Sequence, residues 1–301
     1  MVGTDHAHAS ELADRIRFTA GGRLLADYVH RPADPQVESP RPYFHPLRTL
    51  GGALLTDVRP DDHVWHKGLS WTLPVVGDEN FWGGPSYLAG VGYRQLPNNG
   101  TQRHRAFMEV AGTGFVERLD WIAESGAFLL DEQRRVTATV LDESTWVLGF
   151  TTTLRNTSDA PLVFGSPTTR GRPNAGYGGL FWRGPRSFIG GTVLSAAGAG
   201  GDALRGADAV WLGYTGRHDS GARSTVVIVD RLAAAGAPQR PWFVRSEEYA
   251  CLCPAPFFHR EHVLEAGASF HGSYDVVIAD GAPDAAGLVA QAAALSGGRF
   301  G

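Results

Sequence analysis

Apolar and polar residues alternate along most of the chain, in runs that end at glycine, proline or a short polar turn. The longest example covers residues 115–158, where three alternating segments are separated by turns at residues 125–126 and 142–144. Alternation with a period of two is typical of strands that cover a core with one face and meet water with the other. The stretch therefore predicts an antiparallel meander of three long strands.

Shorter runs of the same kind predict hairpins and single strands elsewhere. Residues 16–30 form two apolar runs on either side of Gly21 and Gly22, and residues 48–58 repeat this pattern around another glycine pair, so both are expected to be hairpins. Further strands are expected at residues 161–165, 188–194, 209–215, 224–230, 242–245 and 269–278.

One segment predicts a helix. Residues 284–298 begin with Asp284 after a proline and end at glycine, which are typical start and stop signals of a helix. The pattern indicates that this helix packs on the outer face of a sheet.

The number of expected strands decides the fold class. With about fifteen strands, no linker and no internal repeat, the chain exceeds the ~10 strands that an open sheet holds before it splits or curls. The sequence therefore predicts an all-β fold, a large antiparallel β-sandwich with one C-terminal helix. It is expected to form a single domain over residues 1–301, with its core from about residue 15 to residue 280.

Composition and charge exclude several classes of function. The net charge of −4 gives no basic footprint for nucleic acid or anionic lipid, and no window approaches the ~20 apolar residues of a membrane span. No signal peptide is expected, because no apolar stretch follows a basic start. Cys251 and Cys253 are expected to be buried thiols, since such close spacing rarely allows an unstrained disulfide. The sequence thus predicts a cytoplasmic protein without nucleic-acid or membrane partners, and it leaves the oligomeric state open.

Residues 41–84 hold chemistry that a β-sandwich core does not require. A buried imidazole or ammonium group costs free energy unless it is paired, so a core made of Val, Ile, Leu and Phe is more stable. A segment that concentrates such groups between strand-like runs is typical of a polar pocket with aromatic walls. The segment contains three tryptophans together with His45, Asp62, His63, His66, Lys67 and Asn80.

Three interpretations of the two central histidines stay open. As acid/base groups, His63 and His66 belong to the residue type that titrates near neutral pH. As ligands of a divalent metal they need a third partner. As structural groups, each would hydrogen-bond a turn. The density of polar groups favours a functional role, and acid/base chemistry over metal binding. Third metal ligands are available in Asp62, His45, His104 and His259.

Aromatic residues beside glycines and arginines predict a surface that binds carbohydrate. An aromatic ring can stack on the C–H face of a sugar, while amide, guanidinium and imidazole groups hydrogen-bond its hydroxyls. For any single tryptophan, a place in the core is an equally good interpretation. The candidates for substrate binding are Asn80, Trp82, Arg103, His104, Tyr177, Trp182, Arg183 and Arg245.

Glu132 is a candidate for a second base. Alternation places Glu132 and Arg134 on one face of their strand, and Asp131 and Gln133 on the other. A buried carboxylate on a concave sheet has a raised pKa and can take up a proton. The alternative is an exposed ion pair between neighbouring strands.

Four blocks of sequence resemble the bacterial family labelled PmoA-like: RPYFHP at residues 41–46, DHVWHKGL at 62–69, NFW at 80–82 and YGGLFWR at 177–183. The label suggests a subunit of a methane oxygenase, but such a subunit needs membrane spans and this chain has none. The resemblance implies a galactose-mutarotase-like supersandwich whose concave sheet binds sugars, in an accessory enzyme of sugar catabolism. Many members of the family carry a second adjacent histidine where this chain has Val64 and Trp65.

Together these observations predict an enzyme that acts on a sugar or keto-sugar by acid/base chemistry, through epimerisation, β-elimination or hydrolysis. His63 and His66 would transfer protons, His45 and Lys67 would orient or polarise a carbonyl group, and Glu132 would serve as a further base. Two alternatives stay open: a metal-dependent oxygenase or hydrolase that uses the two histidines, and a carbohydrate-binding protein without catalytic activity.

Overall fold

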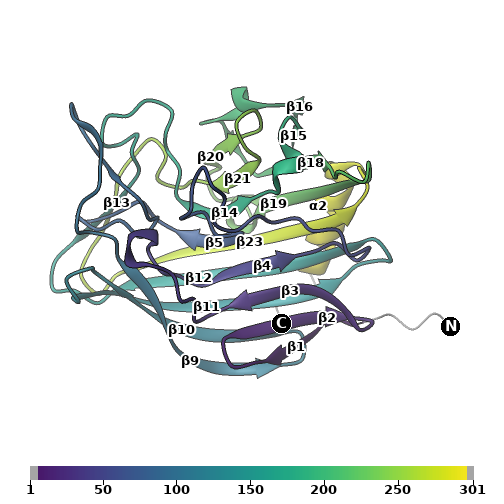
Figure 1. Ribbon diagram of the computed structural model, residues 1–301, viewed down its shortest axis with the longest axis horizontal. Helices are drawn as coiled ribbons and strands as arrows, with labels where there is room; N and C mark the ends of the chain where they lie inside the picture. Colours follow the sequence, from purple (N-terminus) through teal and green to yellow (C-terminus); the bar gives the residue numbers. More distant parts are fainter. Residues whose placement is uncertain (1–5, 297–301) are drawn as a thin grey trace.

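The protein is a sandwich of two nine-stranded antiparallel sheets in the computed structural model, which describes residues 6–296 (Figure 1). The first sheet has the order β1 (His8–Glu11), β2 (Arg15–Ala20), β3 (Arg23–Val29), β4 (Tyr43–Leu47), β5 (Leu69–Thr72), β14 (Gly179–Arg183), β21 (Cys251–Pro254), β20 (Arg240–Arg245) and β17 (Asp208–Ala209). The second has the order β16 (Gly198–Gly200), β15 (Thr192–Ser195), β18 (Trp211–Arg217), β19 (Arg223–Asp230), β23 (Ser269–Asp280), β12 (Thr145–Asn156), β11 (Phe128–Val140), β10 (Gly114–Ile122) and β9 (Thr101–Ala111).

Smaller elements surround this sandwich. A three-stranded sheet joins β22 (His262–Leu264), β13 (Leu162–Gly165) and β6 (Val75–Val76), and β7 (Ser86–Leu88) pairs with β8 (Gly92–Arg94) in a separate hairpin. Three single-turn 3₁₀ helices, η1 (Gln36–Glu38), η2 (Arg186–Phe188) and η3 (Asp202–Leu204), lie in connections, and α1 (Arg231–Ala234) is one turn long. The longer helix α2 (Ala285–Ser296) follows the last strand.

The predicted fold class, a large antiparallel sandwich with a C-terminal helix, is confirmed. The meander at residues 115–158 is β10, β11 and β12, and the hairpin at residues 16–30 is β2 and β3. The hairpin expected at residues 48–58 is present only as a tight antiparallel turn: Arg48 and Leu54 form an isolated bridge, and the N–H of Leu55 donates to the carbonyl of Leu47 at 2.8 Å, but no regular strand follows. The strand expected from residue 188 begins at Thr192, because η2 takes up the preceding residues.

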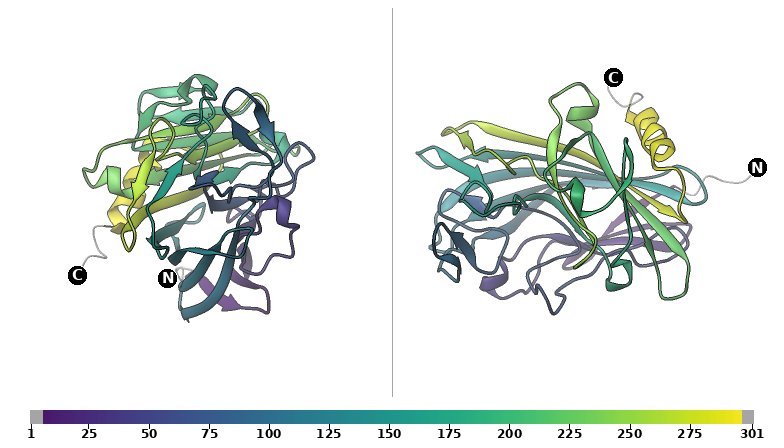
Figure 2. Two further views of the ribbon diagram at one scale, coloured as in Figure 1. Left: turned by 90° about the vertical axis from the view of Figure 1, so that its left-hand side faces the viewer. Right: turned by 90° about the horizontal axis from the view of Figure 1, so that it is seen from above.

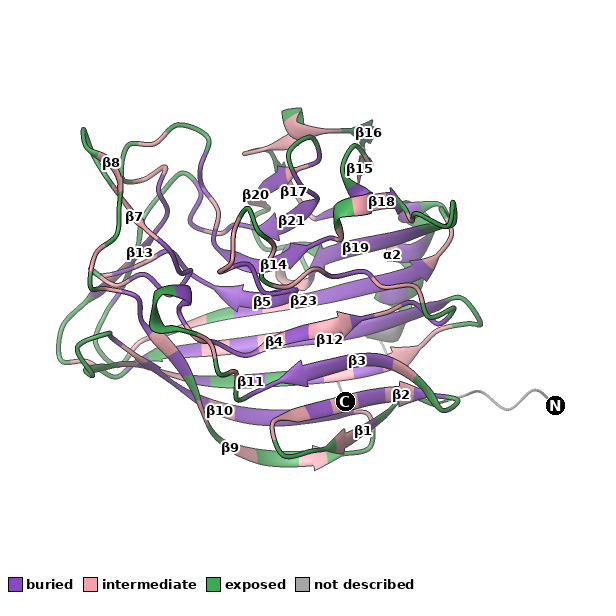
Figure 3. Cartoon of the chain, viewed as in Figure 1, coloured by how far each residue is buried: buried purple, intermediate pink, exposed green. Residues whose placement is uncertain are grey.

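Large aromatic side chains fill the space between the two sheets. Five tryptophans lie there with less than 2% of their surface exposed, and the burial of such rings is a large apolar contribution to stability. Figure 3 shows buried residues along the centre of both sheets, and exposed ones mainly in the loops. The five core tryptophans are Trp71, Trp121, Trp146, Trp182 and Trp242.

Helix α2 covers the outer face of the second sheet (Figure 2). Its residues Leu288 and Ala292 pack in one buried cluster with Trp211 and Val277 of the sheet. The predicted cap is present, since the Asp284 carboxylate accepts a hydrogen bond of 2.9 Å from the backbone N–H of Gly287. The last two residues of the predicted helix lie outside the described residues. No helix in the described part of the chain is long and apolar enough to cross a membrane.

Glu132 belongs to a buried ionic network between the sheets. Its carboxylate accepts hydrogen bonds from Arg134 Nε at 2.8 Å, from Trp121 Nε1 at 2.7 Å and from Thr152 Oγ1 at 2.8 Å. Arg134 also donates to the hydroxyl of Tyr28. Glu132 is fully buried, so it is not the exposed ion pair considered as its alternative.

Substituting Glu132 by leucine is expected to destabilise the protein by about 3–5 kcal/mol, because the guanidinium of Arg134 would stay buried without its carboxylate. Gln133 lies exposed on the opposite face of the same strand, so Gln133→Leu is the matched control and should change stability by less than about 0.5 kcal/mol. Unfolding in urea measures both values. Equal losses in the two variants would contradict a structural role for the Glu132 network.

His30 gives the fold a specific sensitivity to acid. Burial, with the electrostatic interactions of His104 and Arg31 as smaller causes, lowers the pKa of His30 to about 4. Neither ring nitrogen has a hydrogen-bond partner among the described residues. Between its ordinary pKa near ~6.5 and its folded value, the unfolded chain binds a proton at His30 that the folded chain does not. Stability is therefore lost as the pH falls through this window, by up to about 1.4 kcal/mol per pH unit.

Replacing His30 with phenylalanine should make the free energy of unfolding less dependent on pH. Between pH 7 and pH 5, the variant is expected to lose about 2 kcal/mol less stability than the wild type. Urea unfolding at both pH values measures this, and His271→Phe, which changes an exposed histidine, is the control. The same pH dependence in the His30 variant and the wild type would contradict the assignment.

Candidate active site

The candidate site lies on the outer face of the first sheet, where β14, β21 and β20 are neighbours. Along β14, Leu180 and Trp182 point into the main core, while Phe181 and Arg183 point to the outer face. The outer face carries its own buried cluster, which we call the aromatic cluster. It consists of Trp82, Phe181, Phe243, Tyr249, Cys251, Cys253, Ala255 and Phe258, with Trp65 and Tyr177 partly buried against it.

The loop between β4 and β5 brings the two histidines to this face. The backbone N–H of His66 donates to the carbonyl of His63 at 2.9 Å, and this tight turn stacks the two imidazole rings with centroids 4.5 Å apart and planes at 6°. The N–H of Arg183 donates to the carbonyl of Gly68 at 2.7 Å, which ties the loop to β14. The stacking therefore follows from the path of the backbone.

Two glycines let the indole of Trp65 approach the loop after Trp82. Gly83 and Gly84 have φ values of +98° and +69°, where only glycine is unstrained. A Cβ atom on Gly84 would lie 2.7 Å from the Trp65 ring, and one on Gly83 would lie 2.6 Å from the carbonyl oxygen of Glu38. These positions thus fix the two tryptophans beside the histidines.

Arg183 is the central residue of the site. Its Nη2 donates to both carboxylate oxygens of Asp62 at 2.8 and 2.9 Å, and its Nη1 donates to Nδ1 of His66 at 2.9 Å. The guanidinium lies over the ring of Tyr249, 4.3 Å from its centroid, and only 5% of the residue is exposed. A planar guanidinium can hold both partners at fixed angles, whereas an ammonium group cannot.

The contact with Arg183 sets the protonation of His66. A guanidinium only donates, so Nδ1 of His66 accepts and the ring proton of the neutral imidazole sits on Nε2. Burial holds the pKa of His66 well below its usual range, and the electrostatic interactions with His63 and Arg183 add to the shift. His66 is therefore a neutral hydrogen-bond donor at neutral pH.

The carboxylate of Asp62 orients His63 in the opposite sense. Burial alone would raise the pKa of Asp62, but hydrogen bonds from His63 and Arg183 outweigh it and hold the pKa below its usual value. The ionised carboxylate accepts from Nδ1 of His63 at 2.8 Å, which leaves the lone pair of Nε2 free. Asp62 and His63 thus form a carboxylate–imidazole pair of the kind that serves as a general base.

Tyrosines and arginines complete the surroundings. Burial raises the pKa of Tyr249 and of Tyr177, so both phenols stay protonated. The hydroxyls of Tyr177 and Tyr93 lie 2.9 Å apart, and Arg172 donates to the Tyr93 hydroxyl. A cavity of about 290 Å³, which we call the histidine cavity, is lined by His63, Trp65, His66, Trp82, Gly83, Pro85, Tyr93, Arg172, Ala175, Tyr177, Phe243, Arg245, Glu248 and Tyr249.

The structure brings together five of the predicted residues around this cavity: His63, His66, Trp82, Tyr177 and Arg245 line it. Arg183 does not line the cavity, but it contacts His66 from the side away from it. Asn80 acts one step further away, because its side-chain oxygen accepts from the N–H of Trp82 at 2.9 Å and so fixes that loop.

Two other predicted catalytic residues do not reach the cavity. Lys67 is fully buried and forms ion pairs with Glu38 and with Asp34, the latter at 2.9 Å. His45 has Nδ1 3.0 Å from the hydroxyl oxygen of Thr56, and burial lowers the pKa of His45. Both side chains stabilise loops under the site and line none of its walls.

The remaining predicted residues lie elsewhere in the sandwich. Trp182 fills the main core and donates from Nε1 to the carbonyl of Leu55 at 2.8 Å. Arg103 and His104 lie on β9, where Arg103 pairs with Asp120 at 3.2 Å and His104 with Glu117 at 2.6 Å. Glu132 belongs to the network described above. None of these four lines the histidine cavity.

Several residues of the site were missed from the sequence: Trp65, Tyr93, Arg172, Glu248 and Tyr249 line the cavity as well. Strand alternation could not have indicated this set, because four of its members lie outside strands and Tyr93 lies on the three-residue strand β8.

Metal binding was left open by the sequence. Within residues 6–296, no three His, Cys, Asp or Glu side chains converge as ligands of a metal ion. The rings of His63 and His66 are stacked, with Nδ1 of each already engaged by Asp62 or Arg183. Cys251 and Cys253, which could also have been ligands, are free buried thiols in the aromatic cluster, as predicted.

Two solved structures illustrate what the chain is similar to. A polysaccharide lyase shares 11% identity over 97% of this chain and 35% of its own, with a TM-score of 0.35. An alpha-galactosidase from Lactobacillus brevis shares 10% identity over 91% of this chain and 38% of its own, with a TM-score of 0.33. The chain thus spans little more than a third of the length of either, and likeness at this level carries no argument about function.

Among curated proteins the chain has no match. The resemblance to the PmoA-like family and to the mutarotase-like supersandwich stays a prediction. One family model does match, over residues 15–293, and the chain therefore belongs to the family of unknown function DUF6807.

Proposed function

We propose that the protein is an enzyme that acts on a sugar or keto-sugar by abstracting a proton from carbon. The observation that carries this proposal is the pair of stacked imidazoles held in opposite roles at one cavity. Asp62 leaves Nε2 of His63 as a proton acceptor, and Arg183 leaves Nε2 of His66 as a donor. Pairs of titratable groups whose surroundings separate their roles are typical of acid/base active sites.

The chemistry follows from these two roles. Nε2 of His63 would take the proton from a carbon next to a carbonyl group, and the electron pair of the broken C–H bond would move onto the carbonyl oxygen. The Nε2–H of His66 would donate a hydrogen bond to that oxygen as its charge develops. Return of a proton to the other face of this enolate gives an epimer. In β-elimination the enolate re-forms the carbonyl group, its C=C electron pair forms a double bond to the next carbon, and the substituent on that carbon leaves with its bonding electrons and is protonated by solvent.

The walls of the cavity support a sugar as the reacting group. The partly exposed ring of Tyr177, which packs 4.5 Å from the buried ring of Trp82, offers an aromatic surface for the C–H face of a pyranose. The guanidinium groups of Arg172 and Arg245 can hydrogen-bond hydroxyl or carboxylate oxygens. Arg172 has no carboxylate within ion-pair distance among the described residues, so it is available to a ligand.

Proton abstraction accounts for the site better than hydrolysis by two carboxylates. Most glycoside hydrolases use a pair of Asp or Glu residues on either side of the glycosidic bond. Glu248 is the only carboxylate among the described residues that line the histidine cavity, and 66% of its side chain is exposed. Epimerisation and β-elimination are therefore the favoured reactions.

Exchange with deuterated water tests this proposal directly. The protein is incubated in D2O with a panel of keto-sugars and their glycosides, and proton NMR follows the C–H group next to the carbonyl. Replacement of that hydrogen by deuterium in the presence of the wild type is the expected result. Binding of panel members without exchange would favour a carbohydrate-binding protein without catalytic activity. The absence of both binding and exchange would refute the proposal.

A further inference from the structure

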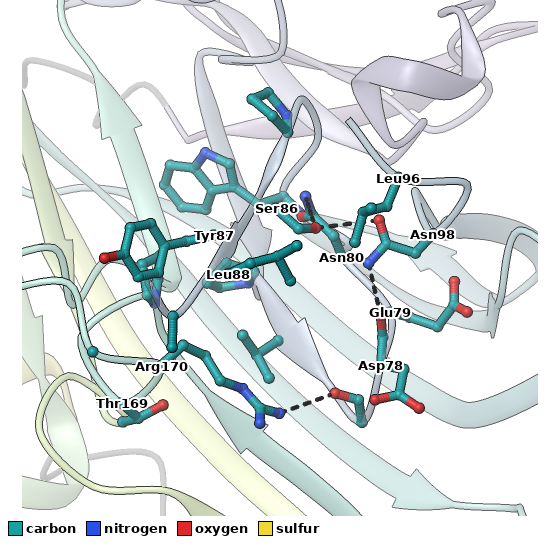
Figure 4. A pocket seen from close by; sticks show the side chains of 18 of the residues that line it. Asp78, Glu79, Asn80, Ser86, Tyr87, Leu88, Leu96, Asn98, Thr169 and Arg170 are labelled. Carbon is teal, nitrogen blue, oxygen red and sulfur yellow. Dashed lines mark hydrogen bonds between the residues drawn. The ribbon is translucent and has the colours of Figure 1, made fainter. Parts of the chain in front are cut away.

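The histidine cavity is the middle one of three adjoining hollows. A hollow of about 790 Å³ shares Trp82, Pro85 and Tyr177 with it, and we call this hollow the aromatic groove (Figure 4). A hollow of about 600 Å³ shares His63, Glu248 and Tyr249 with it and is called the charged groove. The two grooves share no lining residue with each other, so the histidine cavity lies between them.

From this arrangement we infer that the substrate is an oligosaccharide chain that passes through the site. One sugar residue occupies the histidine cavity, and its neighbours on both sides occupy the two grooves. The inference rests on the proposed function and adds the size and extended shape of the substrate. A cavity of about 290 Å³ is at the lower limit of small-molecule pockets, whereas each groove is at least twice as large.

The aromatic groove has the composition of a sugar subsite. Tyr87 of the β7–β8 hairpin stands on one side of the groove, and the pair of Trp82 and Tyr177 separates it from the histidine cavity. Figure 4 shows Asn98 and Arg170 around the same hollow. Aromatic rings with amide and guanidinium groups at their edges suit stacking on one face of a sugar ring and hydrogen bonds to its hydroxyls.

The polar groups of this groove are already oriented. Ser86 donates from its hydroxyl to the side-chain oxygen of Asn98 at 3.2 Å, and the Asn98 amide donates to the carbonyl of Asp78 at 2.7 Å. Arg170 donates to the carbonyl of Gly77 at 3.4 Å. Groups held in place before binding lose little conformational entropy when a ligand arrives.

The charged groove differs in character. Its walls include the carboxylates of Asp57 and Asp61 and the guanidinium of Arg186, while Tyr249 is its one aromatic residue among those described. Such a wall binds sugar hydroxyls by hydrogen bonds with little stacking. The two sides of the histidine cavity are therefore unlike each other, and a chain would bind in one direction.

Binding as a function of chain length tests this inference. Calorimetric titrations use oligosaccharides of one to six residues from four backbones: glucan, galactan, mannan and galacturonan. For the backbone that binds, affinity is expected to rise by about tenfold or more from one residue to three, because each occupied groove adds stacking and hydrogen bonds. Affinity that is the same for every length would overturn the inference.

A blocking variant shows whether the gain comes from the aromatic groove. Ala89 is exposed and lines this groove, so Ala89→Trp fills it with an indole. The variant should lose most of the rise in affinity from one sugar residue to three. Its affinity for the monosaccharide serves as the internal reference. Ala197→Trp makes the same change at an exposed alanine that lines none of the three hollows, and should leave the length dependence intact.

A second variant covers the case in which the new indole turns away from the groove. Tyr87→Ala removes the stacking surface of the hairpin and should reduce the gain with chain length in the same direction. A full length dependence in both variants would overturn the assignment of this groove. If a monosaccharide exchanges its hydrogen for deuterium but affinity does not depend on chain length, only the extended substrate is refuted. If no sugar binds and none exchanges, the proposed function itself is refuted.

Discussion

Replacing His63 with glutamine is expected to lower the rate of deuterium exchange by about 10²- to 10⁴-fold, the usual loss when a general base is removed. Glutamine keeps a hydrogen-bonding group of similar reach but has no basic nitrogen. The fold should persist, because 35% of the His63 side chain is exposed and its one described hydrogen bond joins it to the exposed Asp62. Exchange rates by NMR and the melting temperature are measured together.

The matched control is His271→Gln, since His271 is exposed on β23 and hydrogen-bonds Thr153 at 3.1 Å, far from the cavity walls. This variant should exchange the substrate hydrogen at the wild-type rate. A His63 variant that keeps full exchange would remove His63 as the base. A His63 variant that no longer melts cooperatively would show a structural role instead.

Arg183→Lys is expected to lower the exchange rate by about 10²- to 10³-fold, although the positive charge is kept. An ammonium group cannot donate along the fixed directions that hold Asp62 and Nδ1 of His66 at the same time. His66 then loses the contact that places its proton on Nε2, and the stabilised oxyanion loses its donor. Arg118→Lys, which alters an arginine–carboxylate pair on the second sheet, should leave the rate unchanged.

Nitrogen NMR of the imidazole rings separates this effect from a general disturbance. In the wild type, His66 should show a protonated Nε2 and an unprotonated Nδ1 at neutral pH. In Arg183→Lys, both tautomers are expected, because neither nitrogen is fixed as the acceptor. An unchanged tautomer together with a reduced rate would mean that Arg183 acts by another route.

The fold could be predicted from the sequence wherever alternation was long. The meander of β10, β11 and β12 follows from a period of two kept over three strands, and the helix follows from its cap at Asp284. The hairpin expected at residues 48–58 is limited to the turn around its glycine pair, where Arg48 bridges Leu54, because the residues after Leu55 do not pair with the first half of the stretch. Its backbone instead bonds to the site, as in the hydrogen bond of 3.0 Å from the N–H of Asp57 to the carbonyl of Arg183.

The site could be predicted only in part. His63, His66 and Arg183 stood out because they lie in blocks rich in polar and aromatic residues. Trp182 is a candidate from the sequence as an aromatic ring beside glycines and an arginine, although alternation with Arg183 places it on the opposite face of the strand and therefore in the core. A stricter use of alternation along the strand would have excluded it.

Lys67 and Glu132 could not have been excluded in that way. Both are charged residues in positions that a cavity could share with a core. The partners of Lys67, Asp34 and Glu38, are distant in the sequence, and so are Trp121 and Thr152, which donate to Glu132. Glu132 lies opposite Leu119 and Leu154 in the sheet, and this register is what brings Trp121 and Thr152 to its carboxylate. Only the pairing of strands decides between a base and a buried ion pair.

Arg41 has a consequence for how the site can change. Its fully buried guanidinium donates to the main-chain carbonyls of Trp65 at 2.6 Å and Trp82 at 3.0 Å, as well as to those of Glu38 and Ser39. Every amino acid has a main-chain carbonyl, so these hydrogen bonds from Arg41 do not depend on which side chains occupy positions 65 and 82. The aromatic lining can thus be exchanged while the loops keep their course, and one scaffold can be engineered, or can diverge, toward different ligands.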